Sequence, residues 1–151
     1  MTKNTTQNTT KDTGRSSSIA DLRVYALARQ LEDGAIELVA KLPAALAFGL
    51  ANDLRRSASA VAHNIYEAHR RYSYTIKVDS LHAAIAESEQ TKKLLAEYAG
   101  AGYGAVADQE AQAIGVIKQC WGLIKYIKAR QTEVLAKSAS KTADELVAAR
   151  A

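Results

Sequence analysis

Two runs of basic residues are the side chains in this sequence whose types and spacing best suit a chemical task. One run lies within residues 55–77 and the other within residues 118–130, and the second run contains no acidic residue. Lysine and arginine bind phosphate, and the planar guanidinium of arginine contacts two oxygens at once. We therefore predict an anion-binding surface, with an ordinary solvated helix surface as the alternative. The candidate nucleic-acid-binding residues are Arg55, Arg56, Arg70, Arg71, Lys77, Lys118, Lys125, Lys128 and Arg130.

The three histidines do not have the spacing of a metal site. A di-iron helical bundle uses a Glu-x-x-His motif on two of its helices. Here Glu67 precedes His69 by two residues and follows His63 by four, and the sequence holds no second copy of either arrangement. We therefore predict neither a metal ion nor a cofactor.

Arg56 followed by His63 resembles the arginine and histidine pair of HEPN ribonucleases, which are also helical bundles. In such an enzyme the histidine would act as a general base and the arginine would stabilise charge on the phosphate. Here Ser57 follows the arginine within an alanine-rich stretch, and helical sequences often meet this spacing by chance. Our main prediction is that the chain is not an enzyme, and a HEPN-like ribonuclease remains an alternative.

Other catalytic motifs do not occur in the sequence. It has no Walker loop, no dinucleotide-binding fingerprint and no zincin motif. The single cysteine, Cys120, lies beside Trp121 on a predicted helix, where a small buried residue fits better than a nucleophile. One cysteine also excludes a disulfide scaffold.

The composition predicts that helices position the basic residues. The 151 residues include 30 alanines but only 8 glycines and 1 proline. Alanine favours helix, whereas glycine and proline interrupt it, so an all-β sandwich or barrel is excluded. The net charge is +4, and residues 1–18 supply part of it with three basic residues against one acidic residue. No apolar run could span a membrane and no secretory signal is evident, so we expect a cytoplasmic protein.

Hydrophobic periodicity sets the expected start of the fold. Residues 2–18 contain no apolar side chain, so we expect residues 1–18 to form a disordered polar tail. A first helix should follow with Ser18 as its N-cap and should end at Leu42, because Pro43 disfavours helical geometry in the residue before it. Pro43 could open the second helix, or the helix could begin after a bend at Phe48-Gly49.

Two further helices are expected in the second half of the chain. The third should be capped by Ser73 or Thr75 and should end near the glycine-rich turn at residues 100–104. The fourth should run from about Val106 to about Lys137. Its buried face is expected to hold Ile114, Ile117, Trp121 and Ile124.

Together these elements predict an all-α, up-down-up-down four-helix bundle. Helices of this length joined by short connections pack as antiparallel neighbours. We expect the bundle to cover residues 19–137 and residues 138–151 to form a fraying C-terminal tail.

Residues 53–71 carry the most specific motif, which reads DLRRSASAVAHNIYEAHRR. It resembles the signature of the four-helix bundle proteins encoded in intervening sequences of bacterial large-subunit rRNA genes. Ala60, Ala62 and Ala68 stand where that family usually has Ser, Pro and Gly. The resemblance extends over about residues 20–130. The residues that match the motif are Leu54, Arg55, Arg56, Asn64, Ile65 and Glu67.

This resemblance implies a ring-like homopentamer of four-helix bundles. The family includes accessory proteins of diversity-generating retroelements, which are small basic bundles that bind a reverse transcriptase and its template RNA. The motif residues do not separate the retroelement branch from the rRNA-insert branch.

Asn64 and Glu67 border the apolar stripe of the second helix, so we predict structural roles for both. These roles are hydrogen bonds across the bundle or a subunit interface, and ion pairs between Glu67 and Arg70 or Arg71. The leading functional hypothesis is a non-enzymatic, homo-oligomeric bundle that binds RNA or DNA. It would assist a reverse transcriptase or act as an rRNA intervening-sequence protein. The alternative from another class is a protein-interaction scaffold that does not bind nucleic acid.

Overall fold

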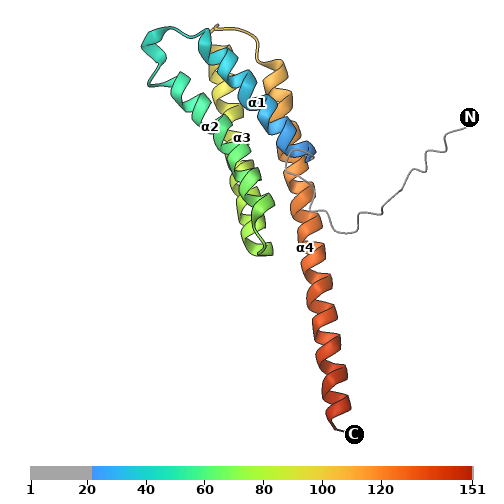
Figure 1. Ribbon diagram of the computed structural model, residues 1–151. Coiled ribbons are helices and arrows are strands. Elements are labelled where there is room, and N and C mark those ends of the chain that lie inside the picture. The colour runs from blue at the N-terminus through green and yellow to red at the C-terminus, as the bar shows by residue number, and fades with distance from the viewer. Residues whose placement is uncertain (1–21, 151) are drawn as a thin grey trace, which may run out of the picture.

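A computed structural model describes residues 22–150, and within them the chain forms helices and no β-strand (Figure 1). The prediction of an all-α protein is therefore confirmed. The predicted polar tail of residues 1–18 lies outside the described residues. The elements are α1 (Arg23–Ala40), the short 3-10 helix η2 (Ala44–Leu46), α2 (Leu50–Arg70), α3 (Tyr74–Gly100) and α4 (Ala107–Ala149).

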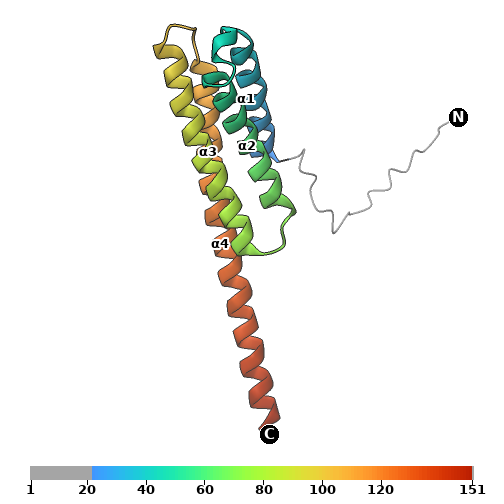
Figure 2. The ribbon, with the colours of Figure 1, turned by 90° about the vertical axis from the view of Figure 1, so that its left-hand side faces the viewer.

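The four long helices form the predicted bundle. α2 packs against α1 and α3, and α4 packs against α3 and α1, so that each helix has two neighbours. The two views show successive helices running in opposite directions, with α4 continuing well beyond the other three (Figures 1 and 2). None of the helices within residues 22–150 is long and apolar enough to cross a membrane.

α1 is shorter than predicted at its C-terminal end. It begins at Arg23 after Leu22, whose backbone is extended, and the predicted cap Ser18 lies outside the described residues. It ends at Ala40, two residues before the predicted end. The amide of Leu42 instead donates to the carbonyl of Val39 at 3.0 Å, a tighter turn that brings the chain to Pro43.

The starts of α2 and α3 follow from local residues. Pro43 opens only the turn η2, and α2 begins after Gly49, which is the later of the two predicted starts. Ser73 is the N-cap of α3, as predicted, and its Oγ accepts a hydrogen bond from the amide of Ile76 at 3.4 Å. The turn after α3 contains Gly102 at φ 84°, a conformation that glycine adopts without a steric penalty.

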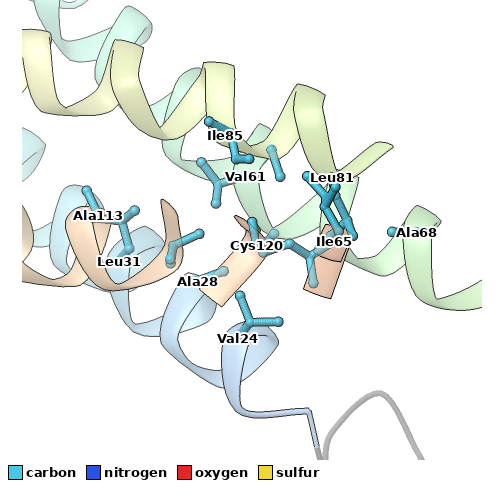
Figure 3. Packing of buried hydrophobic residues seen from close by; sticks show 14 residues of the cluster. Val24, Ala28, Leu31, Val61, Ile65, Ala68, Leu81, Ile85, Ala113 and Cys120 are labelled. Atoms are coloured by element: carbon cyan, nitrogen blue, oxygen red, sulfur yellow. The ribbon is translucent and has the colours of Figure 1, made fainter. Parts of the chain in front are cut away.

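The core consists of two apolar clusters stacked along the bundle. Buried hydroxyl residues of α2 and α3 lie between them, and the Thr91 hydroxyl is 3.0 Å from that of Ser57. The cluster nearer the start of α1 is the larger and draws on all four helices (Figure 3). Its labelled members are Val24, Ala28, Leu31, Val61, Ile65, Ala68, Leu81, Ile85, Ala113 and Cys120. The other cluster consists of Ala35, Leu38, Leu54, Ala58, Leu94, Leu95, Tyr98 and Val106.

The predicted buried face of α4 is confirmed at Ile124, and Ile114 and Ile117 are half-buried, but the placement of Trp121 is wrong. The fully buried side chains are those of Ala113, Val116, Cys120 and Ile124, whereas Trp121 is 50% exposed. Small residues face inward because α4 approaches α1 closely. A side chain on Gly115 would begin only 2.8 Å from a methyl carbon of Leu27.

α4 continues without a break past the expected end near Lys137 to Ala149, so the expected C-terminal tail is the last part of the same helix. From Thr132 to the end of α4 every residue is exposed. We call residues 132–149 the arm. The arm is helical, as the composition allows, but it does not belong to the packed bundle (Figure 2).

Candidate nucleic-acid interface

The arginines near the start of α2 face the groove between α2 and α1. Arg55 and Arg56 are exposed and line a hollow together with Glu32 of α1 and His63 of α2. Glu32 pairs with Arg29 at 2.6 Å, and no ion pair involves Arg55 or Arg56 within residues 22–150. The hollow therefore places the HEPN-like pair, Arg56 and His63, on one surface.

The arginines at the end of α2 are partly neutralised. Glu67 lies 2.9 Å from Arg71 and 3.7 Å from Arg70, so the predicted ion pairs are present. The Arg70 guanidinium also lies over the ring of Tyr66, 5.7 Å from its centroid. All three charged side chains stay partly accessible, so these contacts position the arginines without removing them from the surface.

Lys77 has a structural role in the turn between α2 and α3. Its Nζ donates to the carbonyls of Ala68 and His69 at 3.0 and 3.2 Å, which satisfies the exposed carbonyl end of α2. Partial burial lowers the pKa of this ammonium from its ordinary value. Because two of its three N–H donors are already in use, Lys77 is a poor candidate for phosphate contact.

Asn64 bonds within its own helix. Its side-chain Nδ2 donates to the carbonyl of Ala60 at 2.9 Å, one turn earlier in α2. The hydrogen bond that the structure shows for Asn64 thus stays within α2, whereas the prediction had it cross the bundle.

The basic residues of α4 form a stripe along one flank of the helix. Lys118, Lys125 and Lys128 are exposed, and none of them is paired with an acidic side chain in the described part of the chain. Steps of seven and three residues keep them on one side of the helix, and they span about 15 Å along its axis. Arg130 differs from them, because it pairs with Glu133 at 3.3 Å.

One end of the bundle brings the two basic runs together. Lys77 of α3 and Arg130 of α4 line the same apolar cavity of about 240 Å³, with His69 of α2 at its edge. Arg55 and Arg56 lie about four turns from Arg70, so they do not join this end. Arg130 follows Lys128 by two residues and therefore faces a different flank of α4 from the lysine stripe. The basic residues thus form three separate surfaces, which are the α1–α2 groove, the cavity beside the α2–α3 turn and the α4 stripe.

Trp121 was missed as a surface residue by the sequence reasoning, which placed it in the core. Its spacing from Lys118 and Lys125, three and four residues, puts it on the lysine stripe. The ring of His82 on α3 meets the indole edge to face, with ring centroids 5.3 Å apart and an interplanar angle of 76°. The signal in the sequence was the position of Trp121 between Lys118 and Lys125, three residues after one and four before the other.

Two candidate chemistries have no support in the described residues. Within residues 22–150, no three His, Cys, Asp or Glu side chains are arranged to hold a metal ion. Cys120 is fully buried, and burial raises its pKa to about 12, which keeps the thiol protonated and a poor nucleophile.

The motif on α2 and the bundle around it match a known family. The profile of the 23S rRNA-intervening sequence protein family matches residues 20–129. The chain belongs to this family. The match ends where the packed part of α4 ends, so the arm lies outside it.

A crystal structure supports the fold. The chain is similar to a protein of unknown function from the S23 ribosomal protein family of Bacteroides thetaiotaomicron, with a TM-score of 0.61 and 18% identity. The similarity covers 68% of this chain and 98% of that one. At this identity it shows the four-helix arrangement alone. No curated protein matches the chain.

Proposed function

We propose that this member of the intervening-sequence family is a non-enzymatic, homo-oligomeric bundle that binds RNA. The observation that carries the proposal is the α4 stripe, where three exposed lysines have no acidic partner among the described residues. Such lysines attract a phosphate backbone and release its counterions on binding.

The test compares two variants with the same change in charge. In the first, Lys118, Lys125 and Lys128 are replaced by Gln. In the second, the exposed residues Lys41, Lys137 and Lys141, which follow α1 or lie on the arm, are replaced by Gln. RNA binding is measured by fluorescence anisotropy over a series of salt concentrations. We expect the stripe variant to lose most of the affinity and the control to keep it, whereas equal losses would contradict a localised site.

The homo-oligomer is the second part of the proposal, and the family resemblance suggests five subunits. A ring would repeat the α4 stripe in each copy, so a modest charge per chain would become a strong field. Light scattering from the whole protein checks this directly, because each chain weighs 16.2 kDa. We expect a mass of five chains, and a single chain at micromolar concentration would contradict the assembly.

The third part concerns the partner. An accessory role beside a reverse transcriptase of a diversity-generating retroelement and a role linked to an rRNA insert are both consistent with the proposed RNA binding. A reverse transcriptase gene with a template repeat next to this gene supports the first role, and a position inside an rRNA operon supports the second. If the protein binds its partner while it never binds RNA, the scaffold hypothesis replaces the proposal.

A specific observation also keeps the ribonuclease alternative testable. Arg56 and His63 line the same hollow between α1 and α2, where a phosphate could reach both side chains. Incubation of RNA with the protein and with the His63→Ala variant decides between a ribonuclease and a non-enzymatic bundle. We expect no cleavage that depends on His63, and cleavage that the substitution abolishes would establish the enzyme.

A further inference from the structure

Trp121 is the one tryptophan of the chain, and half of its surface is exposed. Its neighbour in sequence, Cys120, fills the core position on this turn of α4, so Trp121 does not serve the packing of the bundle centre. An indole is among the largest apolar side chains, and burial of its area would stabilise the fold considerably. Packing of the bundle therefore does not explain why a tryptophan stands at this surface position.

The indole is held in place by a second ring. His82 of α3 meets it at an interplanar angle of 76°, with the ring centroids 5.3 Å apart. Edge-to-face pairs of this kind are favourable and fix the relative orientation of the rings. Trp121 is thus an oriented aromatic surface at the junction of α3 and α4.

The residues around the indole are cationic. Lys118 lies three residues before Trp121, and Lys125 and Lys128 lie four and seven residues after it, all on one flank of α4. The charged residue of α3 nearest to His82 in sequence is Asp79, one turn away, and it forms no ion pair with these lysines in the described part of the chain. The surface thus combines a half-exposed indole with positive charge on both sides along α4.

We propose that Trp121 is a stacking platform for an unpaired base, so that the ligand of the α4 stripe is a single-stranded nucleic acid. This inference rests on the proposed RNA binding and names the form of RNA that the same site takes. Proteins that bind single strands combine a basic track with aromatic side chains on which the bases stack. A duplex would use the lysines but not the indole, because its base faces are already stacked on one another.

The chain offers a direct readout. Because Trp121 is the sole tryptophan, selective excitation of tryptophan reports on this position alone. The whole protein is titrated with a single-stranded oligoadenylate and, in parallel, with an RNA duplex at equal phosphate concentration. We expect the single strand to quench the emission and the duplex to bind without quenching it.

Three variants separate stacking from charge. Trp121→Leu keeps an apolar side chain without the ring, and we expect it to lower the affinity for the single strand by roughly 5- to 100-fold. Trp121→Phe keeps an aromatic face and should retain part of the affinity. Phe48→Leu is the matched control, because Phe48 is 97% exposed between η2 and α2, away from the basic surfaces, and it should bind like the unchanged protein. Circular dichroism verifies that each variant is folded.

The outcomes distinguish this inference from the proposal on which it rests. If the lysine variant loses binding while Trp121→Leu binds the single strand normally, the stacking platform is wrong and RNA binding stands. If no RNA binds at any salt concentration, the proposed function fails and the platform fails with it. If the tryptophan emission shifts to the blue with protein concentration and ignores RNA, a second copy covers the indole, which also overturns the platform.

Discussion

At the scale of single residues, Tyr98 shows how a polar group joins distant parts of the chain. Its side chain is fully buried, and its hydroxyl donates to the carbonyl of Leu38 at 3.0 Å, sixty residues earlier. The bond ties the end of α3 to the last turn of α1. It also gives Leu38 a second donor beside the amide of Lys41.

Tyr98→Phe should therefore lower the free energy of unfolding by about 0.5–1.5 kcal/mol, the usual net contribution of one hydrogen bond. Urea unfolding followed by circular dichroism measures the change. The control is Tyr103→Phe, since Tyr103 packs beside Tyr98 but is 37% exposed. An equal loss in both variants would show that the hydroxyl of Tyr98 contributes nothing specific.

Cys120 gives the protein a predictable response to alkaline pH. Burial raises its pKa from 9.0 to about 12, so the folded protein keeps the thiol proton at a pH where the unfolded chain loses it. The folded state then binds more protons than the unfolded state, and stability falls as pH rises between these two values. Below pH 9.0 the contribution of the thiol to stability is complete.

Comparison with Cys120→Ala isolates this effect from the lysines and tyrosines that titrate in the same range. The free energy of unfolding of the unchanged protein, relative to that of the variant, should fall by about 1 kcal/mol between about pH 8 and about pH 10. A thiol reagent should also label Cys120 slowly in buffer and rapidly in urea. A constant difference between the two proteins would contradict the assigned burial effect.

At the scale of elements, the arm of α4 is the feature that packing explains least. Residues 132–149 are all exposed, so within one chain no tertiary contact stabilises them. Intrinsic propensity and a few pairs along the helix remain, such as Lys141 with Glu145 at 3.9 Å. The packed part of α4 already supplies the helical nucleus, so the arm depends on propagation from it without support from packing.

Termination of the chain after Gln131 should leave the bundle intact. The midpoint of urea unfolding is expected to stay the same, while the helical signal in circular dichroism decreases with the loss of the arm. A lower midpoint for the shortened chain would show that the arm packs against another copy. The same comparison at two protein concentrations identifies such a contact, because its contribution grows with concentration.

The sequence predicted the elements better than their contacts, and α4 shows why. The helix type follows from alanine content and periodicity, and the cap at Ser73 from local hydrogen bonding, so these predictions are confirmed. The placement of Trp121 was wrong because large apolar residues were assumed to face the core. Close approach at Gly115 instead favours small residues inside, such as Ala113 and Cys120, and moves Trp121 to the surface.

The candidate site could be predicted in part for a similar reason. The sequence locates the lysines of the α4 stripe, since charged side chains on a helix stay in solvent. It does not show that Lys77 uses its donors on the carbonyls of α2, because that bond depends on how the α2–α3 turn folds back. Tertiary packing likewise brings Lys77 of this turn and Arg130 of α4 to the same cavity.

At the scale of the whole molecule, the separation of the basic surfaces limits which of them one RNA strand can contact. The α4 stripe runs along the bundle towards the arm, whereas Arg55 and Arg56 line the hollow between α1 and α2. One short strand on a single chain would therefore meet the lysines of α4 but not the α1–α2 groove. In a ring, the strand could continue from the stripe of one copy to the stripe of the next.

The salt dependence of RNA binding measures how many copies one strand contacts. Each neutralised phosphate of a single strand contributes about −0.7 to the slope of log affinity against log salt, so three lysines of one chain predict about −2. A strand that crosses two copies should give about −4, and this steeper slope should appear only when the RNA is long enough to span both. Replacement of Lys118, Lys125 and Lys128 by Gln should bring either slope close to zero. A slope that stays the same for short and long strands would mean that each copy binds its RNA independently, even within an assembled ring.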